Sequence, residues 1–137
     1  MLEQKANILN DLIGIPFEHG KMDCWALSIE VFNRYGINIP YYNIARQTVS
    51  DVYDAKCVSN VMEEKALNWI EIEKPIVPCI VALSLGVPGF INHVGVYIGD
   101  SKFIHTTRMR GAVTIERIDN PLFRNKKFYR YDSNSSD

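Results

Sequence analysis

The stretch 22–36 (MDCWALSIEVFNRYG) constrains the fold more than any other part of the chain. Asp23 is suited to cap a helix start, because its carboxylate can accept hydrogen bonds from the unpaired amides of the first turn. Gly36 is suited to the position just after the last turn. Apolar residues fall on more than one side of the helix between them, namely Trp25, Leu27, Ile29, Val31 and Phe32. Because a helix that is apolar nearly all round is buried, the sequence predicts a central helix.

Cys24 falls in the first turn of this predicted helix. The unpaired amides and the dipole at a helix start favour an anion, so a thiolate there would be stabilised and nucleophilic. The alternative is a buried and inert cysteine, since cysteine is among the most buried residue types. This stretch alone leaves both interpretations open.

The chain as a whole has the composition of one ordinary globular domain. Its 137 residues are 47% hydrophobic and 23% charged, with a formal net charge of -1. That length supports a core, and the charge gives no indication of nucleic-acid binding. No apolar run approaches the ~18 residues of a membrane span, so no membrane partner is expected. We expect a single domain over 1–131 and a polar, serine-rich tail over 132–137.

The N-terminal residues lack the basic-then-apolar pattern of a signal peptide. This predicts synthesis in the cytoplasm and leaves the place of action open. The three cysteines, Cys24, Cys57 and Cys79, are odd in number and widely spaced, without a CxxC pair. The pattern argues against a disulfide framework and against a zinc site. Cys57 and Cys79 are therefore expected to be reduced thiols.

The first half of the chain is predicted to be mainly helical. Apolar residues at spacings of three and four favour a short amphipathic helix over 3–13. A loop over 16–21 follows, and His19 is interpreted as a loop histidine, because partner residues of a nucleophile usually arrive from elsewhere in the fold. Residues 43 to about 68 are typical of a helix with breaks, and Val61, Met62, Ala66, Leu67 and Trp69 indicate one face of a second helix. The aromatic residues Tyr41, Tyr42 and Trp69 fit either core packing or the wall of a groove.

From Ile76 onward the chain is rich in strand-forming residues. Apolar and other residues alternate along 93–98, the run 99–101 is a turn, and Phe103 and Ile104 follow. This pattern predicts a β-hairpin. Further strands are predicted over 112–116 and 127–131, so helices precede an antiparallel sheet and the fold class is α+β.

His93 and His105 flank the hairpin turn almost symmetrically. With a loop over 98–100 they would lie directly opposite each other, with Cβ atoms about 4.5–5.5 Å apart, and Gly95 would leave room on that face. Such a pair could supply a base and its orienting partner for Cys24. Metal binding by Cys24, His93 and His105 is a weaker alternative, since no fourth ligand has a standard spacing. The remaining interpretation is that both histidines have only a structural role.

Two segments of the chain resemble motifs of the NlpC/P60 family of cell-wall peptidases. The first is Asp23-Cys24-Trp25, followed by Leu27, Tyr35-Gly36-Ile37 and Ile39-Pro40, which is similar to the cysteine motif. The second is residues 93–99 followed by 102–105, which is similar to the histidine motif. Residues 113–117 and 128–131, with the tryptophan after the cysteine, resemble the branch found in phage tail assembly proteins. The resemblance extends from about residue 16 to residue 131.

The resemblance implies a papain-like fold, with a nucleophile-bearing helix packed on an antiparallel sheet. It implies a peptidoglycan endopeptidase with Cys24 as nucleophile, His93 as base and His105 as orienting residue. The bond would lie in the stem peptide, commonly between D-glutamate and a diamino acid, and no metal or organic cofactor would be required. Phage tail proteins are implied as partners, and action at the cell wall would follow delivery by a tail or another export route.

The resemblance also places four residues, Phe17, Asp23, Trp25 and Asn92, in the substrate-binding or oxyanion region. Phe17 stands where many members have a tyrosine, so the oxyanion hole would depend more on backbone amides. Two other functions remain open: an amidase or acyltransferase on the same fold, and a non-catalytic structural or binding module of a phage tail.

Overall fold

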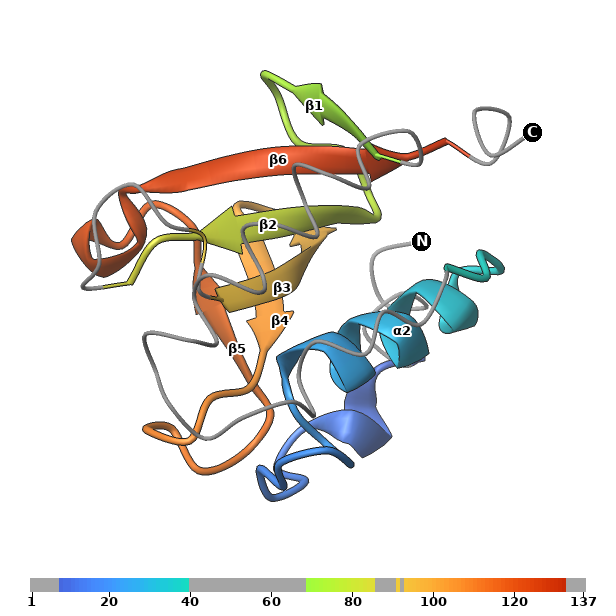
Figure 1. The fold of residues 1–137 in the computed structure, drawn as a ribbon, viewed down its shortest axis with the longest axis vertical. Coiled ribbons are helices and arrows are strands. Elements are labelled where there is room, and N and C mark those ends of the chain that lie inside the picture. Colours follow the sequence, from blue (N-terminus) through green and yellow to red (C-terminus); the bar gives the residue numbers. More distant parts are fainter. Residues whose placement is uncertain (1–7, 40–68, 86–90, 92, 133–137) are drawn as a thin grey trace.

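The computed structural model describes residues 8–39, 69–85, 91 and 93–132 (Figure 1). Within these residues one six-stranded antiparallel sheet has the order β1-β6-β2-β3-β4-β5. The strands are β1 (Trp69–Ile72), β2 (Cys79–Leu83), β3 (His93–Gly99), β4 (Lys102–His105), β5 (Thr114–Arg117) and β6 (Lys126–Tyr131). The helical elements are η1 (Asn10–Leu12), α2 (Cys24–Arg34) and η3 (Pro121–Phe123). The predicted α+β class is confirmed.

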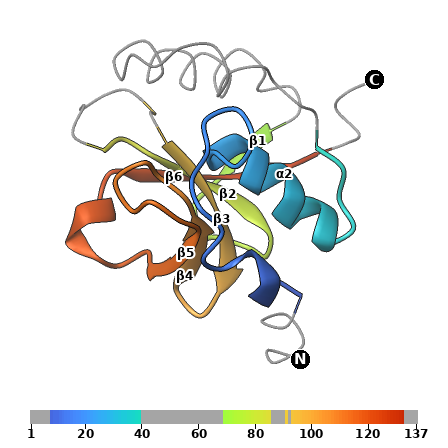
Figure 2. The same ribbon diagram turned by 90° about the horizontal axis from the view of Figure 1, so that it is seen from below.

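Strand β2 lies in the interior of the sheet, and every one of its residues is buried. Ile80 and Ala82 belong to the apolar cluster that contains the buried side of α2. Val81 and Leu83 belong to a second cluster, which includes Phe123 of η3. Figure 2 shows α2 and η3 on opposite sides of the sheet. The continuous apolar run of this strand therefore reflects a sheet that is covered on both faces.

The predicted central helix is confirmed as α2. Asp23 caps its start, accepting a hydrogen bond from the Ala26 amide at 3.0 Å. Gly36 follows its end with φ of +83°, a conformation that glycine adopts without strain, and its amide donates to the Asn33 carbonyl at 2.9 Å. Four apolar side chains of the helix are at most 1% exposed: Trp25, Leu27, Val31 and Phe32. The helix packs on β3 and β4.

The helix predicted over 3–13 is wrong in the part that the structure describes, where only the 3₁₀ turn η1 forms. Its apolar residues Leu9 and Leu12 are buried as expected. Beyond them the chain is extended at Ile13, and the Gly14 amide donates to the Val113 carbonyl at 2.9 Å. Pairing with this distant segment takes the backbone hydrogen bonds that a longer helix would have used.

Trp69 was expected on a helix face, but it begins strand β1 and lies opposite Tyr131 of β6. Its ring meets those of Trp25, Phe32 and Tyr131 edge to face, with centroids 5.1–6.1 Å apart. The side chain is 2% exposed, which favours core packing over a groove wall. A few apolar residues cannot distinguish a short strand from the end of a helix.

The later strands follow the sequence pattern closely. The strands predicted over 112–116 and 127–131 correspond to β5 and β6 with small shifts of their ends. The predictions for residues 1–7, Tyr41, Tyr42, Cys57 and 43–68 lie outside the described residues. In the described part of the chain, no helix has the length and apolarity needed to cross a membrane.

Candidate active site

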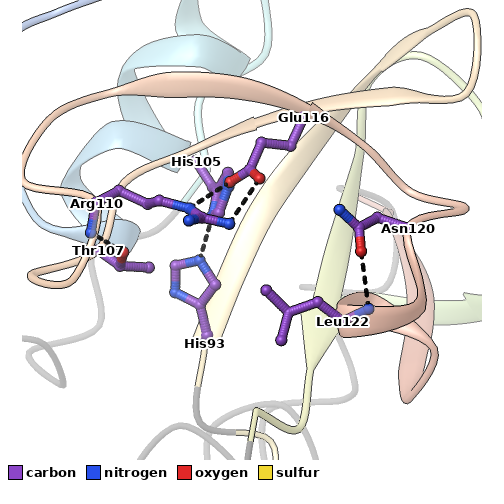
Figure 3. Close-up of polar contacts among 7 residues, drawn as sticks. All are labelled: His93, His105, Thr107, Arg110, Glu116, Asn120 and Leu122. Carbon is purple, nitrogen blue, oxygen red and sulfur yellow. Dashed lines mark hydrogen bonds and ion pairs between the residues drawn. The ribbon is translucent and has the colours of Figure 1, made fainter.

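The β3–β4 hairpin brings the two predicted histidines into direct contact (Figure 3). His93 Nε2 lies 2.8 Å from His105 Nδ1. The two residues are only 5% and 1% exposed, so this polar contact lies inside the protein. Their pairing was predicted from the hairpin.

The predicted register of the hairpin is wrong by two residues. Val96 lies opposite Ile104, and a bulge between Tyr97 and Gly99 shifts the pairing near the turn. Continuing the register places His105 opposite Gly95, so that the two histidines meet diagonally across the strands. Their side chains stay on one face, because a shift of two preserves the alternation of a strand.

Gly95 makes this diagonal contact possible. A Cβ atom at Gly95 would lie 2.8 Å from a ring carbon of Phe103, 2.9 Å from Cβ of His105 and 2.9 Å from the Ile104 carbonyl oxygen. The room expected beside His93 is thus filled by the neighbouring strand. The absence of a side chain at this position lets β4 and its histidine approach.

Two further residues, neither of them predicted from the sequence, extend the polar contact beyond the histidines. Glu116 Oε2 of β5 lies 2.6 Å from His105 Nε2. Arg110 donates to both carboxylate oxygens of Glu116, from Nε at 2.9 Å and from a terminal nitrogen at 2.8 Å. Figure 3 shows these side chains converging with the histidines. The sequence does show an acidic residue on the strand that follows His105. Predicting its contact with His105 would have required knowing how β4 and β5 pair.

The contact of Glu116 with His105 is again diagonal. In the β4–β5 pairing, His105 lies opposite Thr114 and Glu116 lies opposite Phe103. The line His93–His105–Glu116 therefore runs obliquely across three neighbouring strands. Arg110 joins from the turn between β4 and β5, where its amide donates to Thr107 Oγ1 at 2.9 Å.

The ionisable groups along this line have shifted pKa values. Burial, with a contribution from the charge of His105, holds the pKa of His93 well below its ordinary 6.5. Burial also lowers the pKa of His105, although Glu116 opposes this effect. Burial pushes the pKa of Glu116 upward, but the hydrogen bonds from Arg110 and His105 outweigh it and the net shift is downward. At neutral pH the rings are therefore neutral and the carboxylate is charged.

Cys24 is the first residue of α2 and is partly buried. The Asp23 carboxylate beside it accepts from the Gly20 amide at 2.8 Å as well as from Ala26. It thereby ties the preceding loop to the helix start. Because α2 packs on β3 and β4, the cysteine and the histidine pair belong to neighbouring layers of the fold.

The remaining candidate residues differ in their surroundings. Trp25 is fully buried against Trp69. The Phe17 ring lies 5.8 Å from the guanidinium carbon of Arg108. Asn92 lies outside the described residues. The roles assigned to these residues, and to Asp23, stay predictions.

The other titratable residues named from the sequence lie apart from this line. His19 lies in the turn that precedes Met22, as expected for a loop histidine. Cys79 is fully buried in β2, and burial raises the pKa of its thiol to about 11. Both ring nitrogens of His105 are engaged, by His93 and by Glu116. The alternative of a metal bound by Cys24, His93 and His105 therefore lacks a free nitrogen on one of its three ligands.

Solved structures with the same fold come from several sources. NlpC1 from Trichomonas vaginalis aligns with a TM-score of 0.62 and 22% identity, over 95% of this chain and 44% of that one. An NlpC/P60 family protein from Bacillus cereus ATCC 10987 gives 0.60 and 20%, over 95% of this chain and 39% of that one. The chain thus spans less than half the length of these two proteins.

The NlpC/p60 domain of the peptidoglycan hydrolase SagA aligns with a TM-score of 0.54 and 16% identity, over 94% of this chain and 97% of that domain. These likenesses establish the papain-like fold. A comparison with curated proteins gave no match. The model of the NlpC/P60 family matches residues 14–131, a span that includes α2 and every strand of the sheet, and the chain belongs to the NlpC/P60 family.

Proposed function

We propose that this chain is a cysteine peptidase that hydrolyses an amide bond in the stem peptide of peptidoglycan. The observation that carries the proposal is the buried contact between His93 and His105 on the strands against which the Cys24 helix packs. A nucleophile at a helix start, a base and a group that orients the base are the parts required for nucleophilic catalysis. Family membership supports the same reaction.

In the proposed reaction, His93 accepts the proton of the Cys24 thiol and the sulfur attacks the carbonyl carbon of the substrate amide. The carbon–nitrogen bond breaks as His93 returns that proton to the departing amine. Water then attacks the resulting thioester, giving one proton to His93, and the carboxylic acid product leaves. The proton passes back to the sulfur, which restores the starting state. Because its low pKa keeps His93 neutral at neutral pH, the ring begins the cycle as a base.

The negative charge that develops on the carbonyl oxygen requires hydrogen-bond donors. Phe17 has no hydroxyl to offer, so we assign this role to backbone amides at the start of α2. Asp23 supports the assignment, because its bonds to Gly20 and Ala26 hold the loop and the first turn in one arrangement. The donors are thus placed before the substrate arrives, which is the condition for effective electrostatic stabilisation.

The finer assignments extend the resemblance of the sequence motifs. We propose the bond between D-glutamate and a diamino acid as the target, and a phage or prophage tail as the setting in which the domain reaches the wall. The solved domain of SagA, a peptidoglycan hydrolase, shares the fold. The patterns over 113–117 and 128–131 support the tail setting.

Digestion of peptidoglycan tests the proposal. Purified protein would be incubated with sacculi and with defined muropeptides, with Cys24→Ala as the control, and the products identified by mass spectrometry. New free amino groups on the diamino acid, absent with the variant, are expected. Released sugars, or no product from peptidoglycan of any common type, would overturn the proposal.

Alkylation of the thiols tests the nucleophile separately. Cys24 should react with iodoacetamide at near-neutral pH faster than Cys79, because burial keeps the Cys79 thiol protonated and covered. Peptide mapping at several times would give the two rates. Equal rates would refute the assignment of Cys24.

A further inference from the structure

Glu116 and Arg110 have no task in the reaction described above, yet they continue the line of the two histidines. The Glu116 side chain is 17% exposed and the Arg110 side chain is 38% exposed. Each member contacts the next at 2.6–2.9 Å, from the buried His93 to Arg110 at the surface. Such a line of hydrogen bonds has a direction, because each link needs one donor and one acceptor.

Arg110 fixes that direction at the outer end. A guanidinium group has only donors, and its two hydrogen bonds hold the Glu116 carboxylate in its charged form. A charged carboxylate can only accept. The contact of 2.6 Å therefore requires that His105 carries a proton on Nε2 and donates it to Glu116.

The direction then passes to His93. A neutral histidine with its proton on Nε2 has an unprotonated Nδ1, which must accept in the 2.8 Å contact between the rings. His93 is the donor there, so its proton is also on Nε2. The lone pair of His93 is consequently on Nδ1, the nitrogen that does not face His105.

We propose that Glu116, held by Arg110, is a positioning residue that sets the tautomers of both histidines and so presents Nδ1 of His93 as the base. The catalytic consequence rests on the proposed peptidase function, whereas the tautomers are a property of the folded chain alone. Without an obligatory acceptor at position 116, the line can reverse. His105 would then donate from Nδ1 to Nε2 of His93, and the proton of His93 would occupy the nitrogen that has to accept from the thiol.

Glu116→Gln is the most informative variant, because the amide keeps the size of the side chain but can donate as well as accept. Glu71→Gln is the matched control, since Glu71 is an exposed glutamate on β1, at the opposite edge of the sheet from β5. The tautomers of His93 and His105 would be read from ¹⁵N shifts of the imidazole nitrogens at neutral pH. The wild-type protein and Glu71→Gln should show both rings protonated on Nε2. Glu116→Gln should show a mixture or the reversed form.

The same variants would be assayed for peptidoglycan cleavage. Outer hydrogen-bond partners of metal-bound histidines typically contribute about 10- to 100-fold to activity. We expect a loss of similar size in Glu116→Gln, in kcat rather than in KM. Glu71→Gln should leave both unchanged. A role confined to stability would lower the melting temperature without changing the tautomers.

The outcomes separate this inference from the proposed function. A wild-type spectrum with His93 protonated on Nδ1 overturns the inference without any variant, as do unchanged tautomers in a folded Glu116→Gln protein. A protein that shows the expected tautomers and their change in Glu116→Gln, but cleaves no peptidoglycan, refutes the peptidase function and supports the tautomer assignment. Glu116→Ala provides a second variant if Glu116→Gln does not fold; it removes the acceptor that faces Nε2 of His105, so it should shift the tautomers in the same direction.

Discussion

The half of the sheet formed by β1, β6 and β2 differs from the half formed by β3, β4 and β5 in what it buries. The first half surrounds Trp69 with aromatic rings. The second half also has an apolar core, but it encloses His93 and His105 as well, and each contacts a polar partner. Burying an ionisable group without a partner is costly. The comparison shows that this domain buries His93 and His105 where a neighbouring strand supplies a polar partner for each of them.

The largest effect that separates the two halves is expected from His93→Ala. Loss of the base should reduce kcat for peptidoglycan cleavage by roughly 10²- to 10⁴-fold, while the aromatic half of the sheet keeps the domain folded. Steady-state kinetics and circular dichroism would measure the two effects. His19→Ala, a change in the turn before Cys24, is the control and should be nearly silent. Equal losses in the two variants would remove the distinction between the histidines.

Trp69→Ala tests the opposite half. Removing a fully packed tryptophan from a core typically costs about 3–5 kcal/mol in the free energy of unfolding, and the contacts with Trp25, Phe32 and Tyr131 would all be lost. Urea denaturation would measure the cost. The fraction that remains folded should retain its kcat, because the substitution changes none of His93, His105, Glu116 and Arg110. A variant as stable as the wild type would show that this half is not the main support of the fold.

Gly95→Ala sharpens the comparison within the half of the sheet formed by β3, β4 and β5. The new methyl group would meet Phe103, His105 and the Ile104 carbonyl at 2.8–2.9 Å, so β4 must move away. Forcing one carbon into a packed site typically costs about 1–3 kcal/mol, and the displacement also separates the histidine rings. The free energy of unfolding and kcat should therefore both decrease, as denaturation and steady-state kinetics would measure. Gly111→Ala is not a suitable control, because Gly111 has φ of +79° and an alanine there would be strained. Ser84→Ala, just beyond the end of β2, is the control.

The smallest effect concerns the dependence of stability on pH. The pKa values of His93 and His105 are below the ordinary 6.5 in the folded chain. As the pH falls below that value, the unfolded chain binds protons that the folded chain does not, so the free energy of unfolding decreases. Denaturation between pH 7.5 and pH 5.5 would show this decline, above the range in which carboxylates titrate. His93→Gln should make the decline shallower, and an unchanged slope would contradict the assigned pKa direction.

Features that depend on neighbouring residues could be predicted from the sequence. Asp23, Gly36 and the apolar residues between them determine α2, because capping and helix packing act over one or two turns. The alternation over 93–98 determines β3 in the same way. The fold class and the pairing of His93 with His105 followed from these local signals.

Features that depend on distant partners could not be predicted from the sequence. The turn at η1 is short because residues near Gly14 pair with the segment around Val113. Trp69 is in a strand because β6 is available to pair with it. Glu116 joins the site through a diagonal contact between β4 and β5 that no periodicity encodes. The bulge near Gly99 likewise shifted the register of the histidines.

The position of β6 in the sheet has a consequence for the order in which the domain can form. Among the described residues this strand comes last in sequence, yet it lies between β1 and β2. A nascent chain that has reached only β5 therefore exposes an edge of β2, and β1 has as yet no neighbouring strand to pair with. Contacts between residues so far apart in sequence make folding slow. We expect the sheet to close only after residue 131 has been synthesised, so that Cys24 is made well before the domain around it can be completed.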